Sequence, residues 1–166
     1  MSRALFSCTF FRLGALAGAT IGWAAIAFGA SEPALVAAVR QQDVARVEAL
    51  LAENVDVDAT AGDGSTALLV AIELGDLPLA ERLLEAGASA SAANAQRVTP
   101  LAMAARAGDA TLIDLLISRG ADVNERSSEG HTVLMLAARN GQPDAVALLI
   151  GKGADVSATE PFRGQT

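Results

Sequence analysis

TPLAMAARAGD, the stretch from Thr99 to Asp109, has two close counterparts in the same chain. TALLVAIELGD begins at Thr66 and TVLMLAARNGQ begins at Thr132, so the three starts are evenly spaced. A less similar copy precedes them by the same interval and keeps the equivalent positions Gln42, Leu50-Leu51 and Asn54. A fixed period of about 33 residues is typical of solenoid proteins, in which each copy packs on the next. We therefore expect four structural repeats.

The repeated positions predict a pair of helices in each copy. The threonine can cap a first helix with its hydroxyl, and Pro100 suits the first helical position, where a missing N–H costs nothing. The glycines Gly75, Gly108 and Gly141 would end that helix, because glycine readily adopts a left-handed conformation. The acids Asp43, Asp76 and Asp109 then cap a second helix, whose paired apolar residues pack on the first. Further glycines, or Asn54 in the first copy, end the second helix.

These repeated segments resemble the ankyrin repeat, most closely in TPLAMAARAGD and in the later segment LLISRGADVN. The resemblance implies an all-α solenoid of about four helix-loop-helix repeats with short hairpin loops. It places a divergent repeat at 31–62 and further repeats at 63–96, 97–129 and 130–162. The histidine of the family pattern is absent, and its position holds Val36, Leu69, Ala102 and Met135. In the family this histidine makes hydrogen bonds to neighbouring turns, and no side chain at its position in this sequence replaces it. This absence suggests looser turns.

Residues 1–29 differ from the rest of the chain. They contain Arg3 and Arg12 but no acid, and an uncharged apolar run from Leu13 ends in small residues. This order is typical of a signal peptide, expected to be helical and cleaved after Gly29, so we expect a periplasmic or secreted protein. The alternative is an uncleaved membrane anchor, because about 18 apolar residues can just span a bilayer. Contact with a membrane is expected only in that case.

Composition excludes several classes of function. Residues 1–29 hold two of the 12 basic residues and none of the 19 acidic ones, which leaves the rest of the chain with a net charge of −9. Nucleic acid is therefore a poor general partner. The single cysteine lies in the N-terminal segment, and His131 is the only histidine. A metal site, a cofactor site or a catalytic triad would need residues that this chain lacks, so we expect no enzyme. His131 itself occupies a variable turn position and is expected to face solvent or a partner.

One set of charged positions suggests a binding surface. Arg40, Glu73, Arg106 and Arg139 recur at the end of each first helix, on the side that forms the concave groove in the ankyrin family. Stacked repeats would align them in a ladder, which we call the 40/73/106/139 column. In one interpretation these charges simply pair with one another between repeats. In the other, Arg106 and Arg139 form a basic spot that holds a carboxylate of a protein partner. Other candidates for partner contact are Leu74, Arg126, His131 and Met135.

The last three residues, Gly164 to Thr166, resemble the start of a fifth repeat. Copy four nevertheless keeps interior-type apolar residues, whereas an end repeat normally has a polar outer face. Two explanations are open: the chain is part of a longer array, or the end of copy four is covered by Phe162 or by another chain.

Overall fold

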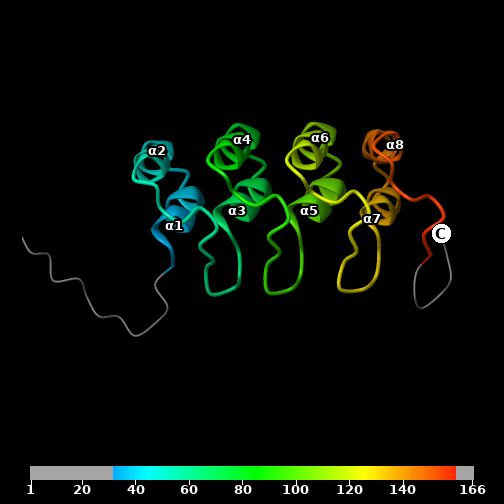
Figure 1. Ribbon diagram of the computed structural model, residues 1–166, viewed down its shortest axis with the longest axis horizontal. Helices are drawn as coiled ribbons and strands as arrows, with labels where there is room; N and C mark the ends of the chain where they lie inside the picture. The colour runs from blue at the N-terminus through cyan, green and yellow to red at the C-terminus, as the bar shows by residue number, and fades with distance from the viewer. Residues whose placement is uncertain (1–31, 160–166) are drawn as a thin grey trace, which may run out of the picture.

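The computed structural model describes residues 32–159, which form four pairs of short α-helices (Figure 1). In chain order the helices are α1 (Ala34–Arg40), α2 (Val44–Ala52), α3 (Ala67–Glu73), α4 (Leu77–Glu85), α5 (Pro100–Ala107), α6 (Ala110–Ser118), α7 (Val133–Arg139) and α8 (Pro143–Gly151). Successive pairs begin at a constant interval along the chain, as the period predicts. The expectations for the signal peptide or anchor, for Phe162 and for the last three residues lie outside the described part of the chain.

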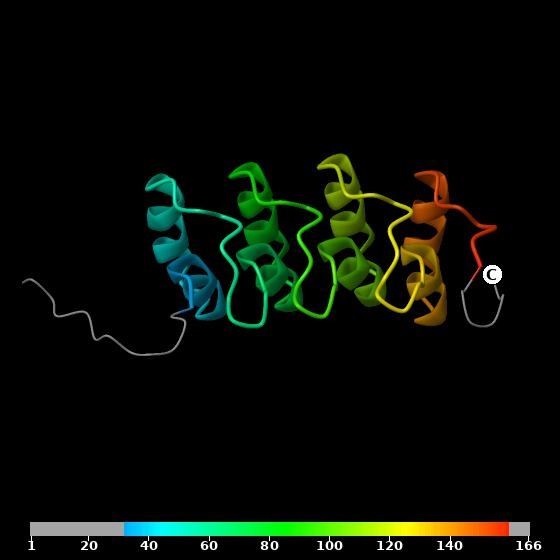
Figure 2. The ribbon, with the colours of Figure 1, turned by 60° about the horizontal axis from the view of Figure 1, so that its bottom comes forward.

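The helices form two layers, with a row of hairpin loops below them. The second helices α2, α4, α6 and α8 lie in one layer and the first helices in the other, and the loops extend away from both (Figure 1). Figure 2 shows the helix pairs repeating along the long axis with the hairpins side by side. Each first helix packs against its own second helix and against the first helix of the next repeat. The described residues contain no strand, only an isolated bridge between Arg126 and Thr132. The all-α solenoid expected from the sequence is confirmed.

All six of the predicted helix caps are present. The hydroxyl oxygens of Thr66, Thr99 and Thr132 each accept a hydrogen bond from the backbone N–H three residues later, at 3.3, 3.1 and 3.2 Å. The carboxylates of Asp43, Asp76 and Asp109 do the same for α2, α4 and α6 at 3.0 to 3.1 Å. The two remaining helices, α1 and α8, follow Pro33 and Gln142, for which no cap was predicted, and they have no side-chain cap.

Left-handed residues end the helices where the sequence predicts them. Gly75, Gly108 and Gly141 have φ angles of 68 to 79° after the first helices. Gln42 and Asn54 adopt φ of 55 and 53° in the first repeat, where the other copies have glycine. The same backbone path is therefore followed in all four repeats, including the divergent first one.

The core is a continuous row of aliphatic side chains between the two helix layers. Its largest fully buried members are Leu68, Leu83, Leu101, Ile113, Leu116 and Leu149. The exposed fraction of equivalent side chains is larger in the fourth repeat, since Leu84 of the second repeat is 5% exposed and the equivalent Ile150 is 48% exposed. Met103 is partly buried and packs against the edge of this cluster. Among the described residues no helix is both long enough and apolar enough to cross a bilayer.

Neighbouring loops are joined by hydrogen bonds from groups other than the missing histidine. The backbone N–H of Ala95 donates to the carbonyl of Asp63 at 3.1 Å, which links two adjacent hairpins. Asp58 and Asn124 accept through side-chain oxygens from backbone N–H groups of the following repeat, at 2.9 and 2.8 Å. These bonds give the turns contacts between repeats that the family pattern assigns to histidine. The expected loosening of the turns is therefore not visible in the contacts.

Candidate functional site

The 40/73/106/139 column lies at the ends of the four first helices, as expected. Arg40, Glu73 and Arg139 are the last residues of α1, α3 and α7, and Arg106 lies in the last turn of α5. All four are exposed to solvent. Because each first helix packs beside the next, the repeat period brings these side chains to one side of the array.

The expected charge pairing within this column is wrong. Arg40 binds the carboxylate of Glu32 at 2.7 Å and that of Asp63, in the next hairpin, at 3.1 Å. Within residues 32–159 neither Glu73 nor Arg106 has an ion pair. The hairpins bring other acids closer to α1 than the neighbouring helix end, so Arg40 is already bound to carboxylates within the protein. The pKa of Asp63 is lowered, first by a hydrogen bond from the backbone N–H of Ser65 and then also by Arg40.

A groove between the third and fourth repeats brings two of the predicted arginines together. Its volume is about 360 Å³, and its walls are two hairpins and two first helices. The lining consists of Arg97 and Val98 from one hairpin, Ala102 and Arg106 from α5, Ser127, Ser128 and Glu129 from the next hairpin, and Leu136, Arg139 and Asn140 from α7 and its end. We call it the arginine groove. Arg106 and Arg139 were predicted to act together, and they line the same groove.

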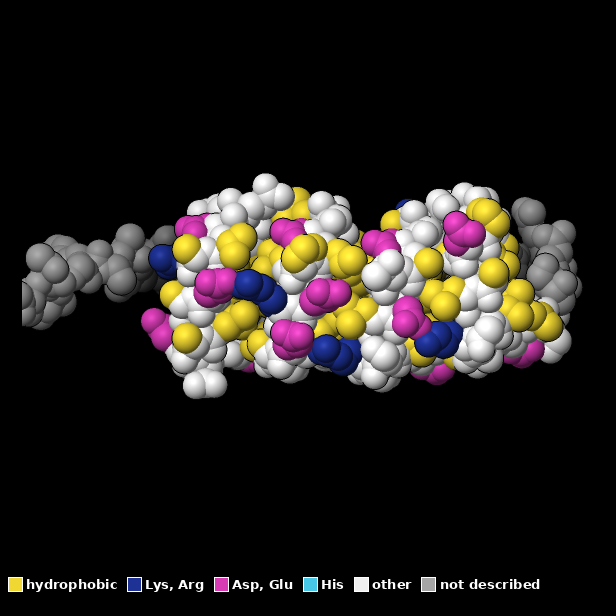
Figure 3. Space-filling model, turned by 90° about the horizontal axis from the view of Figure 1, so that it is seen from above, with side chains coloured by type: hydrophobic (Ala, Val, Ile, Leu, Met, Phe, Trp, Pro, Cys, Tyr) yellow, Lys and Arg dark blue, Asp and Glu magenta, His cyan; other side chains and the backbone are white. Residues whose placement is uncertain are grey.

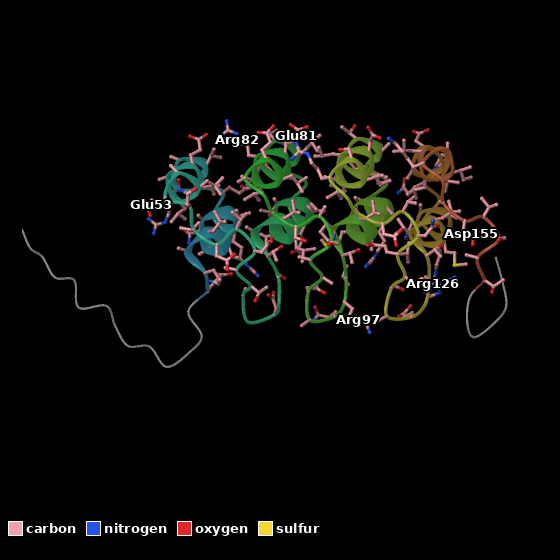
Figure 4. The ribbon with its side chains drawn as sticks, viewed as in Figure 1. Glu53, Glu81, Arg82, Arg97, Arg126 and Asp155 are labelled. Atoms are coloured by element: carbon pink, nitrogen blue, oxygen red, sulfur yellow. The ribbon has the colours of Figure 1, made fainter. Side chains whose placement is uncertain are left out.

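Arg97 is the third basic residue of this groove and was not identified from the sequence. It lies at the far end of the hairpin that precedes α5 (Figure 4). The hairpins are closed by backbone hydrogen bonds at equivalent positions, from residue 61 to 65, 94 to 98 and 127 to 131. The fourth residue of each is left-handed, and it is Gly64, Arg97 and Gly130 in turn, with φ of 78, 60 and 84°. The sequence did contain a signal for this residue. Both neighbouring copies have glycine at the equivalent repeat position, and this copy has arginine.

The remaining candidates are spread along the array rather than gathered in one site. Leu74 is 43% exposed in the second repeat, and Met135 in α7 is partly exposed, as expected. Arg126 donates from one guanidinium nitrogen to the carbonyl of Gly130 at 2.7 Å and to that of Thr159 at 3.3 Å. It lies beside the segment that carries Asp155 (Figure 4). Arg126 thus joins two successive loops, which gives it a structural role.

His131 does not face solvent, so that part of the expectation is wrong. Its side chain is only 12% exposed, and its Nδ1 lies 3.3 Å from a carboxylate oxygen of Glu129. The carbonyl of His131 accepts the hydrogen bond that closes its hairpin, so the residue lies at the base of the loop, next to buried Thr132. The ring therefore offers little surface to a partner.

Glu125 is a half-buried acid near the start of α5. Its carboxylate accepts a hydrogen bond from the hydroxyl of Thr99, which connects the third repeat to the loop before the fourth. Loss of hydration raises the pKa of Glu125, although the bond from Thr99 acts in the opposite direction. No group of three or more histidine, cysteine, aspartate or glutamate side chains in the described part of the chain could hold a metal ion.

The outer face of the second helices has a different charge pattern. Seen from that side, acidic and basic side chains are interspersed with apolar ones (Figure 3). Two of the basic residues pair across repeats, Arg82 with Glu48 and Lys152 with Asp114. This face therefore neutralises much of its own positive charge, in contrast to the arginine groove.

Comparison with known proteins agrees with this architecture. A family model described as ankyrin repeats (3 copies) matches residues 89–160, and a second described as ankyrin repeat matches residues 63–95. No curated protein matches the chain. Arrays of this kind are scaffolds whose surfaces bind other proteins. The chain belongs to the ankyrin repeat family and is a protein–protein interaction module.

Proposed function

We propose that this module is non-catalytic and binds its partner through the face formed by the ends of the first helices and the hairpin loops. The observation that carries the proposal is the position of Arg106 and Arg139. Both are exposed, both line the arginine groove, and neither has a hydrogen bond or ion pair from its side chain within residues 32–159. Unpaired arginines are common anchors of protein interfaces, because a guanidinium can form two hydrogen bonds to one carboxylate.

The charge of the rest of the protein makes this face distinctive. Beyond residues 1–29 the chain has a net charge of −9, so two unneutralised arginines in one groove are an exception on an acidic surface. Attraction between this groove and a carboxylate of the partner is local, and it would determine which segment of the partner is held there. Apart from Trp23 and four phenylalanines in residues 1–29, the only aromatic residue is Phe162, so affinity depends on arginine and aliphatic contacts.

Reversal of both charges tests the proposed face. The variant Arg106→Glu/Arg139→Glu should lose at least about ten-fold in affinity for the partner, because each charge-assisted hydrogen bond is worth about 1.5–3 kcal/mol. The measurement is capture of proteins from an envelope fraction by the immobilised protein, quantified by mass spectrometry. Circular dichroism should show unchanged helicity, since both side chains lie on the surface.

A matched control keeps the change in net charge constant. Arg46 and Arg119 are exposed, lie on or next to second helices, and have no side-chain ion pair among the described residues. Arg46→Glu/Arg119→Glu should retain the proteins that the unmodified protein retains. If the control and the Arg106/Arg139 variant lose the same proteins, or neither loses any, the proposed face is wrong.

Export from the cytoplasm is the second part of the proposal. It is supported by the order of a basic segment, an apolar segment and small residues within residues 1–29. The alternative is a membrane-tethered structural or protective accessory protein of the cell envelope, which keeps that segment as an anchor.

The mass of the protein recovered from cells separates these two possibilities. We expect a protein expressed in a bacterial host to appear in the periplasm or medium with about 29 residues removed, since cleavage follows the small residues. An intact N-terminus in the membrane fraction would favour the tethered protein, and an intact N-terminus in the cytoplasm would contradict both.

A further inference from the structure

The arginine groove combines three guanidinium groups from three separate elements. Arg97 comes from the hairpin before α5, Arg106 from α5 and Arg139 from α7. None of the three side chains has a hydrogen bond or ion pair within the described residues. By contrast, Arg40, Arg82, Arg126 and Lys152 are all bound to carboxylates or carbonyls of the protein. Five arginine side chains of the described residues have no hydrogen bond or ion pair: three line this groove, and the other two, Arg46 and Arg119, lie on or next to second helices.

The backbone at Arg97 adds an independent reason to assign a function. Its φ of 60° lies in the left-handed region, which side chains other than glycine rarely adopt. The two equivalent positions in neighbouring hairpins are Gly64 and Gly130, which adopt that conformation without strain. Strained residues of this kind concentrate at functional sites, where the side chain contributes something that glycine cannot. At residue 97 that contribution is a positive charge at the groove.

The floor and walls of the groove suit a peptide better than an isolated ion. Val98, Ala102 and Leu136 provide apolar surface for aliphatic carbons, and Ser127, Ser128 and Asn140 provide hydrogen-bonding groups for a peptide backbone. The volume of about 360 Å³ accommodates a few side chains and is near the lower limit of ligand pockets. The three arginines outnumber the one acid in the lining, Glu129, so the groove keeps an excess of positive charge.

We propose that the arginine groove binds a short acidic segment of a protein partner, with Arg97, Arg106 and Arg139 holding its aspartate or glutamate carboxylates. This inference rests on the proposed function, and it specifies which chemistry of partner the face selects. Arg97 is the specificity-determining residue, because it is the one arginine of the groove that occupies a left-handed position where the neighbouring hairpins have glycine.

The test is a selection of random twelve-residue peptides displayed on phage against the full-length protein. Selected peptides should be enriched in aspartate and glutamate, and synthetic copies should bind at least ten-fold more weakly to Arg97→Gly. The binding of these peptides should also weaken when their aspartates and glutamates are replaced by the corresponding amides. It should weaken again when the salt concentration is raised to 0.5 M, since the attraction is electrostatic. Inorganic phosphate at 10 mM should not displace them, and complete displacement would indicate a simple anion site and overturn the peptide proposal.

Arg97→Gly is a favourable variant, because it removes the charge and relieves backbone strain together. Its melting temperature should equal or exceed that of the unmodified protein, so a loss of binding cannot come from unfolding. Arg119→Gly removes one exposed arginine outside the groove and should leave the affinity within two-fold.

The outcomes separate this proposal from the broader one. In one outcome, the selected peptides no longer bind Arg106→Glu/Arg139→Glu but bind Arg97→Gly with unchanged affinity. This result would leave the proposed face intact and overturn the role of Arg97. Selected peptides without acidic enrichment would overturn the acidic segment. If no peptide is selected, the acidic segment is overturned, and the proposed face is decided by the capture experiment alone. If the selected peptides bind without dependence on Arg106 and Arg139, both proposals fail.

Discussion

Leu116→Ala should lower the free energy of unfolding by about 3 kcal/mol, because the substitution removes buried apolar contacts and leaves a cavity. Leu116 lies in α6, is 0% exposed, and belongs to the continuous aliphatic core. Its helix packs on α5 of the same repeat and on α8 of the next. The substitution therefore weakens both the helix pair and the interface to the fourth repeat. Stability in a solenoid is approximately a sum of such local terms, so a loss at an interior interface can separate the repeats on either side.

Urea unfolding followed by circular dichroism measures this effect. The variant should unfold at a lower urea concentration than the unmodified protein, and a separate early phase is expected for the fourth repeat. Ile150→Ala is the comparison, because Ile150 belongs to the second helix of the last described pair and is 48% exposed. Ile150→Ala should lower the free energy of unfolding by about 1 kcal/mol or less, since little buried surface is lost. Equal costs for the two variants would contradict the assignment of the core.

Gly64→Ala should destabilise the protein by about 3 kcal/mol for two additive reasons. The φ of 78° at this residue costs an alanine about 1–2 kcal/mol. In addition, a Cβ at residue 64 would lie 2.5 Å from the backbone nitrogen of Ala95, far inside contact distance. That nitrogen donates to the carbonyl of Asp63 at 3.1 Å, so the two hairpins must separate and this bond is lost. Thermal unfolding should show a melting temperature at least about 6 °C lower.

Gly62→Ala is the matched control in the same hairpin. A Cβ at Gly62 meets no atom within 4 Å, and its φ is outside the left-handed region. Replacement of an unstrained glycine by alanine reduces the freedom of the unfolded chain, so Gly62→Ala should be neutral or slightly stabilising. If Gly64→Ala were as well tolerated as Gly62→Ala, the close approach of the two hairpins would be wrong.

Features that depend on neighbouring residues were predictable from the sequence. Thr66, Thr99 and Thr132 cap their helices because a hydroxyl reaches an N–H only three residues away. The constant spacing identified the repeat even in the first copy, where Gln42 and Asn54 adopt the left-handed conformation that glycine has elsewhere. The alignment of Arg106 and Arg139 in one column followed from the same period, whereas the side of the array on which they lie came from the resemblance to ankyrin repeats.

Features that depend on the stacking of neighbouring hairpins were not predictable in this way. Arg40 binds Glu32 and Asp63 instead of Glu73, because hairpin geometry decides which acid is closest. His131 is shielded because the hairpin closes at its carbonyl and leaves it beside buried Thr132.

The sequence by itself determined the number of repeats, the helix pairs, their caps and the negative charge of the surface, because short-range hydrogen bonding, backbone sterics and composition decide them. Only the tertiary structure decided which arginines are bound within the protein and which are not. It brought Arg97 to the same groove as Arg106 and Arg139, of which Arg139 belongs to the next repeat along the chain. That placement depends on how one hairpin stacks on the next, through contacts between residues distant in sequence.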